Sequence, residues 1–172
     1  MSIVTKTGDK CSTKVLDKKT GKLIAVSKSS KIVETIGSID ELNSLLGVIG
    51  GLTDIQNNLF TINAILAGTK LNFGKAKVKK LEVKISKLEK VLPVQRNFIY
   101  YGGDPKASLL FFARAVARRA ERSLVSLHNS SFIIPDSILV YFNRLSDYLF
   151  VKAREINFKL NIKEKAWMGK TF

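Results

Sequence analysis

Hydrophobic residues recur every three or four positions along most of the chain after residue 37, which is the spacing of amphipathic α-helices. Glycines and prolines separate the periodic stretches. We expect five long helices that begin near residues 38, 53, 75, 105 and 135. Because the connections between them are short, successive helices should pack as antiparallel neighbours. The pattern therefore predicts an all-α, up-and-down five-helix bundle.

The first two helices are expected to open at capping boxes. Ser38 is followed three residues later by Glu41, and Thr53 is followed in the same way by Gln56. In such a box each side chain hydrogen-bonds to a backbone amide that the first helical turn leaves free. The sequence therefore predicts helix starts at these two positions.

The later boundaries depend on glycine and proline. Gly74 precedes a lysine-rich third helix, which Pro93 closes. Asp104 and Pro105 supply an N-cap and a first-turn proline for a fourth helix, expected to run to about residue 128. Pro135 opens the fifth helix.

Two segments lie outside the helical pattern. Residues 1–30 are rich in Thr, Ser, Lys and Gly without a helical period, and residues 94–104 form an aromatic and glycine-rich loop. Loops on a rigid scaffold often carry function. Neither a repeat nor a low-complexity linker divides the chain. We expect a single domain over 1–172, with the bundle over 32–160 and a tail over 161–172.

The composition is that of an ordinary globular protein, with 45% hydrophobic and 25% charged residues among 172. No stretch approaches the roughly 20 apolar residues of a membrane span, and the first residues lack the apolar core of a signal peptide. We therefore expect a cytoplasmic protein without membrane attachment. Cys11 and His128 are the only cysteine and histidine, so a Cys/His zinc site is excluded.

The chain is strongly basic, with a net charge of +15. Such a charge attracts nucleic acids, anionic surfaces and phosphorylated small molecules. Much of it comes from lysines 75, 77, 79, 80, 84, 87 and 90, which alternate with apolar residues at helical spacing. This run is typical of the solvated face of a helix. A nucleic-acid patch is the alternative, but no aromatic residue in the run could stack on bases.

Four of the seven arginines fall within nine residues, although lysine outnumbers arginine by 22 to 7. On a helix, Arg114, Arg118, Glu121 and Arg122 share one face, where Glu121 could pair with Arg114 or Arg118. The opposite side is expected to be closed by Phe112, Val116, Ala120 and Leu127. Arginine is favoured where phosphate or carboxylate is bound by two parallel hydrogen bonds. The cluster is a candidate polyanion site, and a plain solvated face is the alternative.

Residues 5–14 (Thr, Lys, Thr, Gly, Asp, Lys, Cys, Ser, Thr, Lys) could wrap a triphosphate with hydroxyls, backbone amides and lysines. By itself this loop could also be a polar turn, since it is neither a Walker loop nor a dinucleotide fingerprint. Four further segments add specificity: 39–44, 98–103, 118–122 and 143–147. In this order and spacing, the five segments resemble the PduO-type ATP:cob(I)alamin adenosyltransferases, which are trimeric five-helix proteins.

The resemblance implies transfer of the 5′-deoxyadenosyl group of ATP to the cobalt of reduced cob(I)alamin or a related corrinoid. The products would be adenosylcobalamin and triphosphate, and Mg²⁺ would assist. The resemblance also implies a homotrimer with active sites between subunits, and an electron-supplying reductase as a partner.

The resemblance assigns roles to individual residues, none of them as a protein ligand of a metal. Phe98 matches the aromatic that lies against the lower face of the corrinoid and helps expel its axial base. Asp40 and Arg114 match a pair that joins adjacent subunits. The expected catalytic residues are Phe98, Arg118 and Asn143. The expected contacts to ATP are Thr5, Lys6, Thr7, Gly8, Thr13, Lys14, Lys28, Arg118, Arg119, Ala120, Glu121, Arg122 and Asn143.

The chain departs from the family pattern at Cys11, where glycine is usual, at Tyr100 and Tyr101, and over 17–25. Cysteine resists the positive φ that glycine adopts freely. Two other functions therefore stay open: a nucleotide- or corrinoid-binding bundle that has lost catalysis, and a basic nucleic-acid-binding protein. For Trp167 in the tail, the alternatives are packing on the bundle and closure over bound corrinoid.

Overall fold

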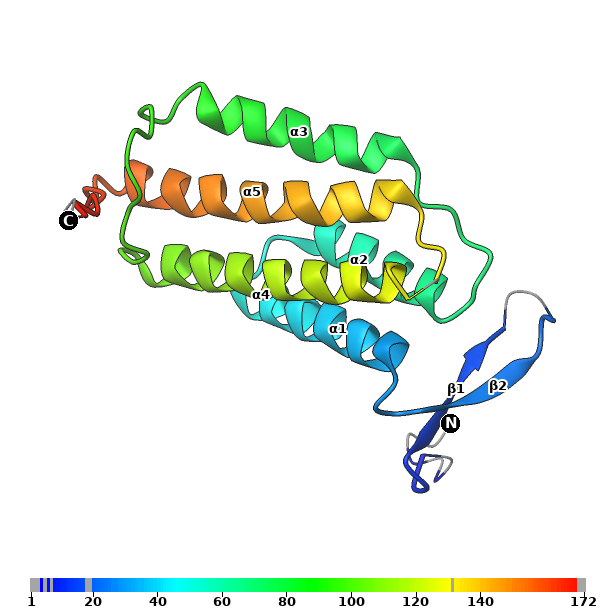
Figure 1. Cartoon of the computed structure of the whole chain (residues 1–172). Coiled ribbons are helices and arrows are strands. Elements are labelled where there is room, and N and C mark those ends of the chain that lie inside the picture. The colour runs from blue at the N-terminus through cyan, green and yellow to red at the C-terminus, as the bar shows by residue number, and fades with distance from the viewer. Residues whose placement is uncertain (1–3, 5, 7, 18–19, 131, 170–172) are drawn as a thin grey trace.

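The computed structural model describes residues 4, 6, 8–17, 20–130 and 132–169. Two short strands precede five helices, and the predicted five-helix bundle is confirmed (Figure 1). The elements are β1 (Ser12–Leu16), β2 (Leu23–Ser27), α1 (Lys31–Ile49), α2 (Thr53–Leu66), α3 (Lys75–Glu89), α4 (Pro105–His128) and α5 (Asp136–Lys159).

The arginine-rich helix α4 lies at the centre of the bundle, packed against α1 on one side and α5 on the other. α3 covers α5 and α2 covers α1. The strand pair projects from the end of the bundle where α1 begins, while the C-terminal tail leaves α5 at the opposite end (Figure 1). α4 therefore runs from the end that holds the tail to the end that holds the strands.

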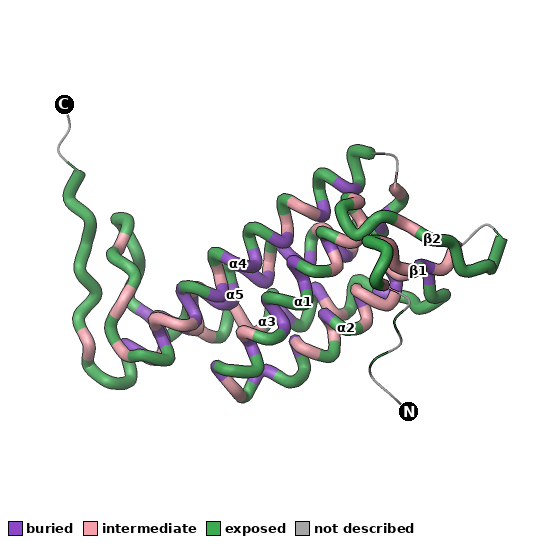
Figure 2. The backbone as a smooth tube through the Cα atoms, turned by 90° about the horizontal axis from the view of Figure 1, so that it is seen from below, coloured by how far each residue is buried: buried purple, intermediate pink, exposed green. Residues whose placement is uncertain are grey.

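One continuous core joins the five helices, and buried positions follow the helix sides that face each other (Figure 2). In α1, for example, Ile39, Leu42 and Leu46 are completely buried. Tyr141 of α5 is also buried, and its hydroxyl accepts a hydrogen bond from the Asn58 amide at 3.1 Å. Burial raises the pKa of Tyr141, so the phenol stays neutral. Within the described residues, no helix combines the length and apolar composition that crossing a membrane requires.

The predicted start of the fourth helix is confirmed at Asp104. Its carboxylate accepts hydrogen bonds from the backbone amides of Lys106 at 2.8 Å and Ala107 at 3.4 Å. Pro105 then occupies the first turn, where its missing N–H costs nothing. These local contacts fix where α4 begins.

Neither predicted capping box forms, although the second helix does begin at the predicted Thr53. α1 begins at Lys31, and Ser38 lies inside it, where its hydroxyl donates to the carbonyl of Glu34 at 3.0 Å. The apolar side of α1 continues backwards through Ile36 and Ile32, which pack against the core and favour the longer helix. At the second position Leu52 is the N-cap, and the Gln56 amide donates to the carbonyl of Asn43 at 3.1 Å. Packing between helices therefore outweighs both local motifs.

The N-terminal segment contains a β-hairpin where the sequence indicated an irregular loop. β1 and β2 pair antiparallel from Ser12 opposite Ser27 to Leu16 opposite Leu23. The strands have the sequences STKVL and LIAVS, in which apolar and polar residues do not alternate as they do in a half-buried strand. Only Val15 of the two strands is buried. The hairpin is fixed to the bundle because the Leu16 amide donates to the carbonyl of Ala67 at 2.9 Å.

Replacing Gly68 by alanine is expected to destabilise the fold by at least about 2 kcal/mol. Gly68 has a φ of +106°, and a Cβ there would lie 2.0 Å from the carbonyl oxygen of Leu16. Chemical unfolding should show the loss. Gly37→Ala is the matched control, because nothing lies within 4 Å of a Cβ at that helical position. It should stabilise by about 0.5–1 kcal/mol, and equal effects of the two changes would contradict the argument.

Candidate active site

The arginine cluster on α4 divides between two neighbouring helices. Arg119 forms an ion pair with Glu41 of α1. On the other side Glu121 accepts a hydrogen bond from the Asn143 amide of α5 at 3.1 Å. Arg118 lies between these two sides of the helix, and its side chain is exposed. Among the described residues, the Arg118 guanidinium makes no hydrogen bond or ion pair, and it is flanked by the anchored side chains of Arg119 and Glu121.

The predicted pairing of Glu121 with arginines was wrong. In the part of the chain that the structure describes, no ion pair joins Glu121 to an arginine; its partner is Asn143. The side-chain amide oxygen of Asn143, Oδ1, in turn accepts from Arg144 at 2.5 Å. This chain of contacts spans α4 and α5, so it fixes Asn143 beside the cluster. The sequence predicted both residues but not their contact.

The predicted buried side of α4 was correct for Val116, Ala120 and Leu127 and wrong for Phe112, whose ring is 56% exposed. Phe112 lies two residues before Arg114 on the outer surface of the bundle. Ala120 is completely buried, so its side chain faces the core and not the polyanion surface.

Two adjoining cavities lie between α1 and α4 on the arginine side, and both include Glu34 and Arg119. The larger, of about 460 Å³, also includes Lys28 from the turn after β2. The smaller, of about 240 Å³, includes Lys31 and Arg122. Four cationic side chains from three different elements therefore surround one stretch of surface, which suits a polyphosphate.

The hairpin places Lys28 at this surface. Its backbone amide donates to the carbonyl of Cys11 at 3.0 Å. A Cβ at Gly8 would lie 3.0 Å from the Lys28 ammonium, so glycine leaves room for that charge. Thr13 and Lys14 belong to β1, and Lys6 is exposed with a φ of +57°. The predicted ligands Thr5 and Thr7 lie outside the described residues.

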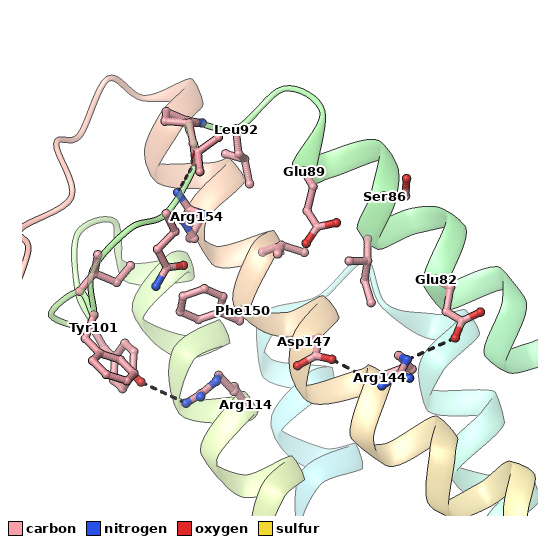
Figure 3. A pocket seen from close by; sticks show the side chains of 17 residues that line it. Glu82, Ser86, Glu89, Leu92, Tyr101, Arg114, Arg144, Asp147, Phe150 and Arg154 are labelled. Atoms are coloured by element: carbon pink, nitrogen blue, oxygen red, sulfur yellow. Dashed lines mark hydrogen bonds and ion pairs between the residues drawn. The ribbon is translucent and has the colours of Figure 1, made fainter.

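A third cavity, which we call the aromatic cavity, has a volume of about 700 Å³ (Figure 3). It lies toward the other end of α4, between α3, α5 and the loop that follows α3. Phe98 stands on its rim and is 74% exposed. Tyr101 and Phe150 form an aromatic wall, and their rings are 6.5 Å apart. The cavity is therefore open to solvent, with an aromatic side.

Arg114 lines the aromatic cavity and neither cavity of the polyanion surface. Its guanidinium donates to the Tyr101 hydroxyl at 3.2 Å and lies 5.4 Å and 5.5 Å from the rings of Tyr101 and Phe150 (Figure 3). Asp40 is exposed on α1, and the described residues hold no ion pair between Asp40 and Arg114. Within one chain the predicted pair does not form.

Sequence reasoning missed the charged residues of α5 that line this cavity. Arg144 donates to Glu82 of α3 at 3.2 Å and lies 4.0 Å from Asp147 (Figure 3). Burial raises the pKa of the Asp147 carboxyl, and Arg144 acts against that shift. Arg154 is nearly buried at the end of the same helix. A signal was present for Arg144 and Asp147, which both lie in the segment 143–147, but not for Arg154.

α4 connects the two regions. Arg114 at the aromatic cavity and Arg122 at the polyanion surface are eight residues apart, which is about 12 Å along a helix. The fold and site thus define a helical-bundle protein that offers a polyanion surface and an aromatic-walled cavity on one rigid helix. A family model for cobalamin adenosyltransferases matches residues 3–156, and the chain belongs to this family.

Relatives from distant organisms match almost the whole chain. The corrinoid adenosyltransferase of Bacillus subtilis is 37% identical over 180 residues, which cover 94% of this chain and 90% of that protein. The corrinoid adenosyltransferase MMAB of Bos taurus is 33% identical over 187 residues, covering 96% of this chain and 75% of its own length.

Solved structures share the fold. A variant of the PduO-type ATP:corrinoid adenosyltransferase from Lactobacillus reuteri, complexed with cobalamin and ATP, superposes with a TM-score of 0.89 at 32% identity. The match covers 98% of this chain and 100% of that one. A second variant of that enzyme, complexed with ATP, gives a TM-score of 0.86 at 32% identity, with 96% and 100% covered.

Proposed function

We propose that this chain transfers the 5′-deoxyadenosyl group of ATP to the cobalt of reduced cob(I)alamin or a related corrinoid. Cobalt attacks C5′ of the ribose, the bond between C5′ and oxygen breaks, and triphosphate leaves with that electron pair. The products are adenosylcobalamin and triphosphate. The observation that carries the proposal is that α4 contributes both to the polyanion surface, through Arg119 and Arg122, and to the aromatic cavity, through Arg114.

On the polyanion surface, the role of the protein is to orient ATP and to neutralise the leaving group. We assign Lys28, Arg119 and Arg122, which line the two cavities, to the phosphates, with Gly8 leaving space beside Lys28. Arg118 lines neither cavity, and we assign it to the phosphates because it is exposed beside them on the same helix. Glu121 and Asn143 hold each other at 3.1 Å beside Arg118. Charge that is already in position stabilises the developing triphosphate without reorganisation.

Mg²⁺ fits this surface as an ion bound mainly through phosphate oxygens. Among the described residues, no group of three or more His, Cys, Asp or Glu side chains could hold a metal. Mg²⁺ usually needs only one or two protein carboxylates in addition to substrate phosphates and water. Glu34 would supply one, since it lines both cavities with Arg119. When bound, the ion would neutralise further charge on the triphosphate.

In the aromatic cavity, the role of the protein is to position the corrinoid and to exclude other ligands from its cobalt. We assign Phe98 to the lower face, where an apolar ring offers no atom that could bind cobalt. Reduced cobalt is a strong nucleophile, so the reaction needs no general base. The single histidine, His128, is exposed in the last turn of α4 and does not line the aromatic cavity, which agrees with a reaction that needs no general base.

We also propose that the active sites form between the subunits of a homotrimer. Asp40 and Arg114 would pair across the interface, and a neighbouring chain would cover Phe112. Arg118, which lines neither cavity of its own chain, would then face the hairpin of the neighbouring subunit. We further propose that the protein is cytoplasmic and that a reductase supplies the electron that reduces the corrinoid. Residues 1–30 of the single domain would bind the nucleotide.

The test is to incubate the protein with ATP, Mg²⁺ and chemically reduced cobalamin and to follow the absorbance change that marks the cobalt–carbon bond. Product formation supports the proposal. ATP binding without product would favour the bundle that has lost catalysis. Salt-sensitive binding to nucleic acid, without protection by ATP, would favour the basic nucleic-acid-binding protein.

Cys11→Gly is expected to leave turnover and ATP affinity within about threefold of the wild type. Cys11 has a φ of +56°, the left-handed conformation that glycine adopts without strain. The chain therefore already has the turn that glycine would form, at a cost of about 1 kcal/mol. Calorimetric titration with ATP and the cobalamin assay measure both quantities. A gain of a hundredfold would mean that cysteine distorts the site.

A further inference from the structure

The C-terminal tail is attached to the loop that carries Phe98. The Tyr100 amide donates to the carbonyl of Lys165 at 2.9 Å, and the Trp167 amide donates to the carbonyl of Phe98 at 2.7 Å. Ile99 and Ala166 form an antiparallel bridge between these hydrogen bonds. The backbone at Phe98 is therefore held by residues that lie nearly seventy positions later in the sequence.

The side chain of Phe98 depends on the same tail. Its ring meets the Trp167 ring edge to face, with centroids 6.4 Å apart at 71°. Among the described residues, no other ring contacts it, and it remains 74% exposed. The position of Phe98 on the cavity rim therefore follows the position of the tail.

An ion pair fixes the tail to the bundle. Arg154 of α5 donates from Nε to one carboxylate oxygen of Glu164 at 2.6 Å and from Nη2 to the other at 2.9 Å. The same Nη2 donates to the carbonyl of Pro93 at 2.9 Å, just before the loop that leads to Phe98. The Arg154 side chain is 6% exposed and that of Glu164 is 26% exposed. One guanidinium thus joins α5, the start of the loop and the tail.

We propose that Arg154 and Glu164 are a positioning pair, which holds the tail and thereby sets Phe98 against the lower face of the bound corrinoid. A bidentate pair to a planar guanidinium fixes distance and orientation together, which a single hydrogen bond does not. Neither residue needs to touch the reacting atoms. This proposal rests on the proposed function, because it assigns to Phe98 its role in that reaction.

The pair could instead contribute only to stability, and Glu155 offers the matched control. Glu155 also lies on α5 and pairs with Lys152 and Lys159 at 2.6 Å each. Its side chain is 10% exposed against 26% for Glu164, although its partners Lys152 and Lys159 are 33% and 69% exposed against 6% for Arg154. Neither lysine belongs to the tail. Glu155→Gln therefore removes a sheltered, paired carboxylate near the end of the same helix without releasing Phe98.

The experiment compares Glu164→Gln and Glu155→Gln in the full chain. For Glu164→Gln we expect kcat to fall about tenfold while KM for ATP stays within about twofold. Bound cob(II)alamin should retain more of its axial base, seen in its absorbance spectrum. Glu155→Gln should leave both quantities unchanged. An unaltered Glu164→Gln enzyme, or an equal loss in both variants, would overturn the proposal.

A second comparison tests whether Glu164 acts through Phe98. In a Phe98→Ala background, adding Glu164→Gln should change kcat by less than about twofold, because the group that it positions is already gone. A further tenfold loss would show that Glu164 acts on something else, and would overturn the proposal.

Trp167 provides a readout that does not depend on turnover, because it is the only tryptophan in the chain. Releasing the tail should shift its fluorescence to longer wavelength and increase its quenching by acrylamide. We expect both changes in Glu164→Gln and neither in Glu155→Gln. A wild-type protein without turnover would contradict the proposed function, whereas an unchanged Trp167 signal in Glu164→Gln would contradict the positioning pair alone.

Discussion

Arg118→Ala is expected to lower kcat/KM for ATP at least tenfold. One charge-assisted hydrogen bond to phosphate contributes about 1.5–3 kcal/mol, and 1.4 kcal/mol corresponds to a factor of ten. Arg118 is exposed, and its guanidinium has no partner among the described residues. It is therefore free to bind phosphate, whereas Arg119 is already paired with Glu41.

The substitution should leave the surrounding helix intact. The contact that Arg118 does make uses its backbone carbonyl, which accepts from Arg122 at 3.1 Å and remains in the alanine variant. Arg118→Lys tests the geometry, because lysine keeps the charge but loses the planar fork. We expect it to fall between alanine and the wild type.

Lys87→Ala controls for charge. Lys87 is exposed on α3 and makes no ion pair in the described part of the chain, so its removal lowers the net charge by the same amount. Steady-state kinetics with reduced cobalamin should show turnover within about twofold of the wild type, as for most surface changes. If Lys87→Ala lost as much as Arg118→Ala, general electrostatics would explain both results.

Elements were predictable from the sequence where local chemistry decides them. Asp104 caps α4 and Pro135 precedes α5 as expected, because these residues act on their own first turn. The start of α1 was not predictable from its motif, since Ser38 competes with the apolar residues Ile32 and Ile36. The hairpin was not predicted either. Its strands lack alternating apolar and polar residues, and only Val15 is buried. A backbone hydrogen bond from Leu16 to Ala67, which no sequence motif indicates, fixes it to the bundle.

In the candidate site, the sequence predicted residues that stand out along one helix but not the contacts they make with other helices. The arginine cluster stood out because four arginines in one helix are visible without any tertiary information. The partners of these residues were not visible, since Asn143 meets Glu121 only after α4 and α5 pack together. Arg154 and Glu164 carry no motif at all, and their pairing depends on how the chain turns after α5 ends.

Phe98→Ala is expected to lower kcat by about a hundredfold while KM for ATP changes less than about threefold, the scale of loss that follows misplacement of a reacting group. Phe98 lies on the rim of the aromatic cavity, at the opposite end of the bundle from the hairpin that holds Lys28. Its loss should therefore alter the corrinoid and not ATP. Kinetics with reduced cobalamin and the absorbance spectrum of bound cob(II)alamin measure the two effects separately.

Phe60→Ala is the matched control, because that ring is 60% exposed on α2 and lines none of the cavities described above. It should leave kcat within about twofold. If Phe98 acts by denying cobalt a lower ligand, Phe98→Leu should recover part of the rate, since leucine is also apolar, whereas Phe98→His should recover none. Equal rates for leucine and histidine would mean that the ring only fills space. The order alanine, histidine and leucine therefore separates exclusion of a ligand from packing at the same position.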